Sequence, residues 1–167
     1  MICLRYTLQP EIDTLRMDKY MINGDVSTRE ARQNEIDKDN EMYLAGFAMW
    51  LKNKGLSNKT INTHIRNVDF YINDYLCYYD LKDASQGCTE INGFLGDWFI
   101  RKAAWSSRAH IKANAASIKK FYEYLLTEHF VTQEDYDDLC VEIKMFMSDW
   151  LDEMKRYEDM IYGDDFF

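Results

Sequence analysis

Apolar residues recur every three or four positions through most of the chain, which is the period of an amphipathic α-helix. The clearest series begins after Ser57, a residue typical of a helix N-cap, and predicts a helix of about five turns. The predicted apolar side of this helix consists of Ile61, Ile65, Val68, Ile72, Tyr75, Leu76 and Tyr79. Its predicted polar side carries Lys59, Asn62, Thr63, Arg66 and Asn67.

An earlier helix is predicted from the capping-box pattern Ser27-Thr28-Arg29-Glu30 to about Asn53. Gly55 suits the left-handed position that follows a helix. The predicted inward residues of this helix are Ile36, Tyr43, Phe47, Trp50 and Leu51. Upstream of it, alternating apolar residues at 4, 6 and 8 predict a short extended arm that ends at Pro10.

Three further helices are predicted downstream, each after a capping residue. One opens at Thr89, a second at Ser106 or Ser107 and runs to about His129, and a third opens at Thr132. Their predicted apolar sides are Ile91, Phe94, Leu95, Trp98 and Phe99; then Ile111, Ala115, Ile118, Phe121, Tyr122 and Leu125; and last Leu139, Ile143, Phe146, Trp150, Met154, Tyr157 and Ile161. The second of these helices shows Arg108, Lys112, Asn114, Ser117, Lys119 and Lys120 on its other side. The pattern predicts an all-α, four- to five-helix bundle, divided into an arm (1–26), a helical core (27–130) and a C-terminal helix with its tail (131–167).

Composition agrees with long helices and a buried core. The 167 residues include one proline and seven glycines, and 47% of them are hydrophobic. No apolar run approaches the roughly 18 residues of a membrane span, and the N-terminus lacks the features of a secretory signal. We therefore expect a cytoplasmic protein without a membrane partner. The four cysteines are far apart, so we expect reduced thiols, with Cys77 and Cys140 as small buried hydrophobic residues and no metal site.

Charge is distributed unevenly along the chain. The net charge of −9 argues against a nucleic-acid partner at first sight. However, residues 43–126 contain 11 Lys or Arg and 7 Asp or Glu, whereas residues 127–167 contain 3 and 13. The middle of the chain is therefore basic, and the acidity is concentrated at its C-terminal end.

Sequence motifs of the common enzyme classes are absent. There is no glycine-rich phosphate loop, no Gly-x-Ser-x-Gly, no His-Glu-x-x-His and no calcium loop. Adjacent carboxylates such as Asp137 and Asp138 are poor acid–base candidates, because a tuned pair needs burial or partners. We expect no enzyme activity, no cofactor and no small-molecule substrate.

Several short motifs occur in an order that is similar to one known domain. Gly55-Leu56-Ser57 is followed by Lys59-Thr60-Ile61, and Ser106-Ser107-Arg108 by Ile118-Lys119-Lys120-Phe121-Tyr122-x-Tyr124-Leu125. This order resembles the N-terminal core-binding, SAM-like domain of phage integrases and tyrosine recombinases. The resemblance covers residues 43–126.

The resemblance implies a four-helix domain whose second and fourth helices lie along double-stranded DNA. Carried over by position, the DNA-binding residues are Ser57, Lys59, Thr60, Thr63, Arg66, Ser107, Arg108, Lys112, Ser117 and Lys120. Cations and short hydroxyls are also the side chains that phosphate contacts require. The alternative is that both rows are the solvated sides of amphipathic helices.

Two departures from the family limit what is implied. Only 41 residues follow Leu126, with one arginine among them, so the catalytic arginines and the tyrosine nucleophile of a recombinase have no counterpart. The family continues with a linker, whereas this chain continues with an acidic amphipathic helix. That helix either covers the bundle as a fifth helix or docks a partner or second copy through residues 139–161, with Phe146, Trp150, Met154 and Tyr157 as contacts.

Three hypotheses follow. The first is a non-catalytic, integrase-like DNA-binding module of a phage or mobile element, acting as an accessory factor in DNA recombination and integration or derived from a shortened integrase. The second is a protein-interaction module that uses the acidic helix. The third is DNA binding autoinhibited by that helix, in which removal of residues 133–167 tightens binding, provided that the truncated chain still folds.

Overall fold

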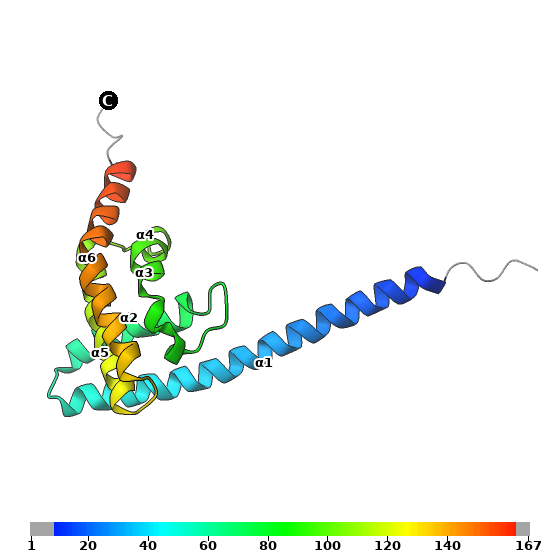
Figure 1. The fold of residues 1–167 in the computed structure, drawn as a ribbon, viewed down its shortest axis with the longest axis horizontal. Helices are drawn as coiled ribbons and strands as arrows, with labels where there is room; N and C mark the ends of the chain where they lie inside the picture. The colour runs from blue at the N-terminus through cyan, green and yellow to red at the C-terminus, as the bar shows by residue number, and fades with distance from the viewer. Residues whose placement is uncertain (1–8, 163–167) are drawn as a thin grey trace, which may run out of the picture.

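The computed structural model describes residues 9–162 of the chain, with side chains from 28 to 161, and this part is all-helical (Figure 1). The all-α class is therefore confirmed. The elements are α1 (Gln9–Asn53), α2 (Asn58–Asp69), η1 (Phe70–Tyr75), η2 (Ala84–Thr89), α3 (Ile91–Gly93), η3 (Phe94–Trp98), α4 (Phe99–Lys102), α5 (Arg108–Thr127) and α6 (Gln133–Tyr162). None of these helices is long and apolar enough to cross a bilayer.

Helix α1 is much longer than the sequence pattern predicts. It begins at Gln9, so the predicted start at Ser27 is wrong, and its N-terminal half extends away from the other helices (Figure 1). Pro10 lies in the first turn, where a missing N–H costs nothing. No proline interrupts the segment that follows, so the helix passes through the capping-box pattern. The arm expected at residues 4–8 lies outside the described residues.

The C-terminal half of α1 joins the bundle. Its buried side chains, Ile36, Asn40, Tyr43, Phe47 and Leu51, are spaced by three or four residues. The predicted apolar side is therefore confirmed, except that Trp50 is only half-buried and Asn40 was not expected there. Asn40 Nδ2 donates to Asn73 Oδ1 in η1 at 2.7 Å.

The predicted turn at Gly55 and the predicted caps at Ser57 and Ser107 are confirmed, whereas Thr89 belongs to η2 and does not cap α3. Gly55 has a φ of +81° after α1. Ser57 Oγ accepts from the Thr60 N–H at 3.3 Å, and Ser107 Oγ accepts from the His110 N–H at 3.2 Å. These caps fix where α2 and α5 begin.

Two helical segments contain π-helical turns that the periodicity did not predict. The helix that starts at α2 ends in η1, and η3 interrupts the helix between α3 and α4. The helix ends at Tyr75, so Tyr79, predicted to face inward on a longer helix, lies in the following turn and is 69% exposed. The predicted inward residues of α3, η3 and α4, from Ile91 to Phe99, are all buried.

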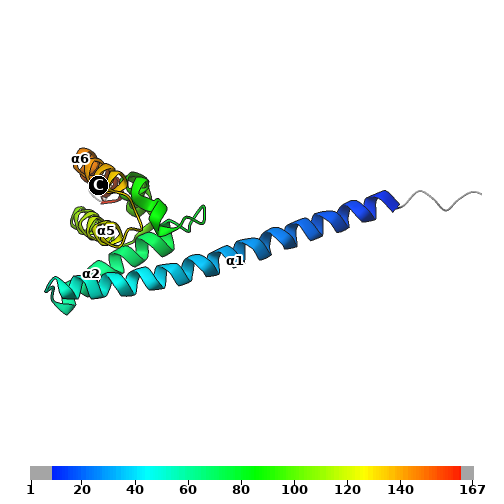
Figure 2. The same cartoon turned by 60° about the horizontal axis from the view of Figure 1, so that its bottom comes forward.

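Helices α5 and α6 lie side by side and cross α1 steeply (Figures 1 and 2). The core between these layers is rich in aromatic residues, such as Phe47 packed edge-on to Phe121 at 5.4 Å. Two fully buried tyrosines, Tyr71 and Tyr122, donate at 2.6 Å to the backbone carbonyls of Gly87 and Ala84 in η2. The polar connector between α2 and α3 is thereby attached to the core.

Helix α6 is a fifth helix of the same bundle. Leu139, Trp150 and Met154 are buried in the common core, and Trp150 Nε1 donates to Asn92 Oδ1 at 2.7 Å. Trp150 and Met154 are therefore wrong as partner-binding residues, because they already pack within the chain. Phe146 and Tyr157 are half-buried, and Ile161 is 48% exposed. Cys88 is buried, whereas Cys77 and Cys140 are only half-buried.

Candidate nucleic-acid interface

Helices α2 and α5, the two that the resemblance assigns to DNA, pack against each other along a polar seam. Ser117 Oγ donates to the Ala113 carbonyl at 2.8 Å, and it lies 2.9 Å from both His64 Nδ1 and Asn67 Nδ2. A hydroxyl has one proton, so Ser117 accepts from the other two groups, and His64 carries its proton on Nδ1. Burial, and then the nearby Lys120 ammonium, lower the pKa of His64.

One residue predicted to bind DNA, Ser117, lies inside this seam. Ser117 was expected on the exposed side of α5, but it is 1% exposed and holds α2 and α5 together. Asn114, also expected on the polar side, is 3% exposed. Helical periodicity marks both residues as polar, but it does not distinguish solvent from a polar contact with another helix. Ser117 is therefore not available to a phosphate.

The other predicted cations form an unbalanced basic surface, here called the basic face. It consists of Lys59 and Arg66 on α2 and Arg108, Lys112, Lys119 and Lys120 on α5. Within residues 28–161, no carboxylate forms an ion pair with any of these six side chains. All but the half-buried Lys120 are exposed.

Three of the other five cations in residues 43–126 form ion pairs, and Lys52 and Lys102 form none with a described residue. Lys54 pairs with Glu123 at 2.7 Å, Lys82 with Glu90 at 2.7 Å, and Arg101 with Asp97 at 2.6 Å. Helices α2 and α5 contain two carboxylates, Asp69 and Glu123, and Glu123 is already paired with Lys54. Six of the eight cations in residues 43–126 that pair with no described carboxylate thus lie on these two adjoining helices.

The predicted hydroxyl groups lie at the start of the same helices. Ser57 and Ser107 are the N-caps, Thr60 Oγ1 lies 2.9 Å from Ser57 Oγ, and Thr63 Oγ1 donates to the Lys59 carbonyl at 3.1 Å. Ser57 and Ser107 stabilise the helix starts, whereas Thr63 bonds the backbone within α2. Helix N-termini also favour anions through their free N–H groups and dipole.

A cavity of about 420 Å³, here called the seam cavity, opens between α2, η1 and α5. Periodicity did not predict it, because its residues come from α2, η1, α4, α5 and the loop between α4 and α5. Trp105, in the connection between α4 and α5, is an exposed aromatic residue in a short polar loop, and it is the one sequence signal for this site. The cavity is lined by Thr63, Arg66, Asn67, Asp69, Phe70, Asp74, Phe99, Trp105, His110, Ala113 and Asn114.

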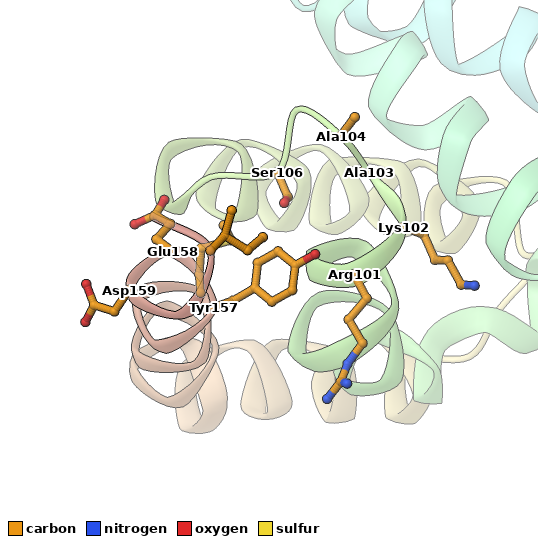
Figure 3. Close-up of a pocket in the computed structure, with 10 residues that line it drawn as sticks. Arg101, Lys102, Ala103, Ala104, Ser106, Tyr157, Glu158 and Asp159 are labelled. Atoms are coloured by element: carbon orange, nitrogen blue, oxygen red, sulfur yellow. The ribbon is translucent and has the colours of Figure 1, made fainter. Parts of the chain in front are cut away.

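A second cavity, of about 680 Å³, lies between the C-terminal half of α6 and the end of α4 (Figure 3). Tyr157 points across it towards α4, and Arg101 and Lys102 stand on the opposite wall, whereas Glu158 and Asp159 point outward (Figure 3). Its charges are mixed, and Arg101 is already paired with Asp97.

Nothing in the described part of the chain assembles a metal site from His, Cys, Asp and Glu side chains. Comparisons of the chain with protein-family models, curated proteins and solved structures find no match, so the integrase resemblance rests on the quoted motifs.

Proposed function

We propose that this chain binds double-stranded DNA through the basic face of α2 and α5, as a non-catalytic module with the SAM-like fold of integrase core-binding domains. The observation that carries the proposal is the concentration of six unpaired cations on two adjoining helices in a protein of net charge −9. Neutralising phosphates with such cations releases counterions, which supplies affinity independent of sequence. The biological role we infer is that of an accessory factor of a mobile element, or a shortened integrase.

The arrangement of acidic residues is compatible with this function. No carboxylate of α6 forms an ion pair with the basic face in the described residues. At an ionic strength of about 0.1 M, charges more than about 10 Å apart are largely screened in water. A local basic surface can therefore attract DNA although the whole chain is acidic.

The test is a gel shift against random duplex DNA at low salt. The full chain is compared with the double variant Lys112→Glu, Lys120→Glu and with the control Lys144→Glu, Lys155→Glu. The control changes the net charge equally but places it on exposed positions of α6. We expect binding by the native chain and the control and its loss in the first variant; absent binding, or equal loss in both variants, refutes the proposal.

A second candidate is protein interaction through α6, and the cavity in Figure 3 favours it. Since Trp150 and Met154 pack inside the chain, this interaction would use Tyr157 and Ile161 near that cavity, as the contact between two copies. Light scattering of the full chain and of Tyr157→Asp tests it. A monomer at all concentrations excludes the second candidate.

A further inference from the structure

The volume and lining of the seam cavity have no role in the binding of phosphates by the basic face. It adjoins the basic face, because Arg66 belongs to both. Its volume of about 420 Å³ falls within the roughly 300–1,000 Å³ of small-ligand sites. Its inner lining combines aromatic rings with hydrogen-bond acceptors.

The aromatic part is Trp105 together with Phe70. Their ring centroids lie 5.2 Å apart with an interplanar angle of 56°, and Trp105 is 55% exposed. Phe70 holds the indole on one side and leaves much of its surface open. An exposed ring of this kind is a platform on which a nucleobase stacks.

The polar part consists mainly of acceptors. Asn114 Nδ2 donates to the His110 carbonyl at 2.8 Å, but its buried Oδ1 receives no hydrogen bond from any described residue. Two carboxylates, Asp69 and Asp74, also line the cavity, and Asp69 Oδ1 already accepts from Asn73 Nδ2 at 2.7 Å. Burial, and secondarily the charge of Asp69, raise the pKa of Asp74. A ligand that suits this lining brings N–H donors, and an anion placed inside would be repelled.

The backbone at the cavity wall is unusual. Phe70 and Asp74 both belong to the π-helical turn η1, which directly continues α2. Such turns cost stability relative to α-helix and occur frequently at functional sites. The turn places one ring and one carboxylate in the same cavity.

We propose that the seam cavity binds an unpaired nucleobase that carries an exocyclic amino group, stacked on Trp105, while its phosphates lie on the basic face. The amino group donates to carboxylate oxygens such as those of Asp74, and Arg66, which belongs to both the cavity and the basic face, pairs with the attached phosphate. This inference rests on the proposed function, and it adds recognition of a base to contact with the backbone. Single strands and unpaired bases within a duplex are the two sources of such a base.

The test is fluorescence anisotropy with four labelled DNA probes and the full chain. The probes are a fully paired duplex, the same duplex with one bulged cytosine or one bulged thymine, and single-stranded oligodeoxycytidine. The variants are Trp105→Leu, which removes the ring, Trp105→Phe, which keeps a smaller ring, and Tyr79→Leu as a control. Tyr79 is an aromatic residue outside this cavity and is more exposed than Trp105, at 69% against 55%.

We expect the cytosine bulge and oligodeoxycytidine to bind about tenfold more tightly than the paired duplex. Trp105→Leu removes that gain, Trp105→Phe keeps most of it, and Tyr79→Leu changes nothing. A gain restricted to the bulge or to the single strand identifies the source of the base. An equal gain for bulged thymine overturns the assignment to an amino-bearing base.

The two proposals fail separately. If the paired duplex binds in a Lys112-dependent manner but unpaired bases add nothing, or Trp105→Leu has no effect, the cavity inference is overturned and the proposed function stands. If the paired duplex does not bind, the proposed function is overturned. Binding of oligodeoxycytidine alone, lost in Trp105→Leu, then still supports the cavity.

Discussion

The salt dependence of DNA binding tests how many cations of the basic face contact phosphate. Log K falls with log salt concentration with a slope of about −0.9 for each phosphate neutralised on duplex DNA. The six unpaired cations of the basic face set an upper bound of roughly −5.4 on the slope. A fourfold rise in salt would then weaken binding by roughly two-thousandfold.

The perturbation is the double variant Arg66→Gln, Lys112→Gln, which takes one cation from each helix. Both side chains are exposed and unpaired, so their removal leaves no buried charge behind. The upper bound changes to roughly −3.6, and the same rise in salt then weakens binding by only about 150-fold. The difference of about 1.8 in slope is the quantity to measure.

The assay is anisotropy of a labelled random duplex, titrated at several potassium chloride concentrations with the native chain, this variant and the control Lys144→Gln, Lys155→Gln. The control removes the same net charge from exposed positions of α6. The reasoning is refuted if the native slope is near zero. It is also refuted if the control lowers the slope as much as the variant, because net charge and not the basic face would then govern binding.

Three further predictions concern stability. Tyr71→Phe removes the 2.6 Å hydrogen bond to the Gly87 carbonyl, which keeps the Glu90 N–H at 3.1 Å, so urea unfolding should show a loss of about 0.5–1.5 kcal/mol. His129 has a φ of +63° in the turn after α5, where glycine carries no penalty, so His129→Gly should raise stability by about 1 kcal/mol; a lower melting temperature would contradict this. His64 has a lowered pKa in the folded state, so its contribution is present above its unfolded value of 6.5 and is lost as pH falls through the folded value. Stability measured from pH 7 to pH 5 should therefore fall more steeply for the native chain than for His64→Asn.

The sequence predicted features of this fold that depend on local chemistry. The cap at Ser57 and the left-handed Gly55 follow from backbone geometry over a few residues, and both are present. The inward side of α5 follows from a regular period, since every predicted core residue from Ile111 to Leu125 is buried. These features can be predicted without knowing how distant segments of the chain pack together.

The features that were missed depend on contacts between distant segments. Ser117 meets His64 across 53 positions of sequence, and Asn40 meets Asn73 across 33. Such polar contacts leave no periodic signal, so Ser117 was predicted to be exposed. The seam cavity was missed for the same reason, because Trp105 became informative only once α2 and α5 were known to adjoin.

Helix α6 contains both buried apolar residues and a net charge of −7, from 10 Asp or Glu and 3 Lys or Arg, and this combination bears on the autoinhibition hypothesis. For α6 to cover the basic face it would have to leave the bundle, exposing Leu139, Trp150 and Met154. Burial of large apolar side chains contributes about 1.5–3 kcal/mol each, so three of them amount to roughly 5–9 kcal/mol. That is comparable to the whole stability of a domain, about 5–15 kcal/mol. Removal of residues 133–167 would therefore unfold the chain instead of releasing an inhibited form.

While α6 stays in the bundle, its carboxylates act on DNA only at long range, where salt screens the repulsion. Substitution of charged residues at exposed positions of α6 is therefore the appropriate test of whether this helix weakens DNA binding.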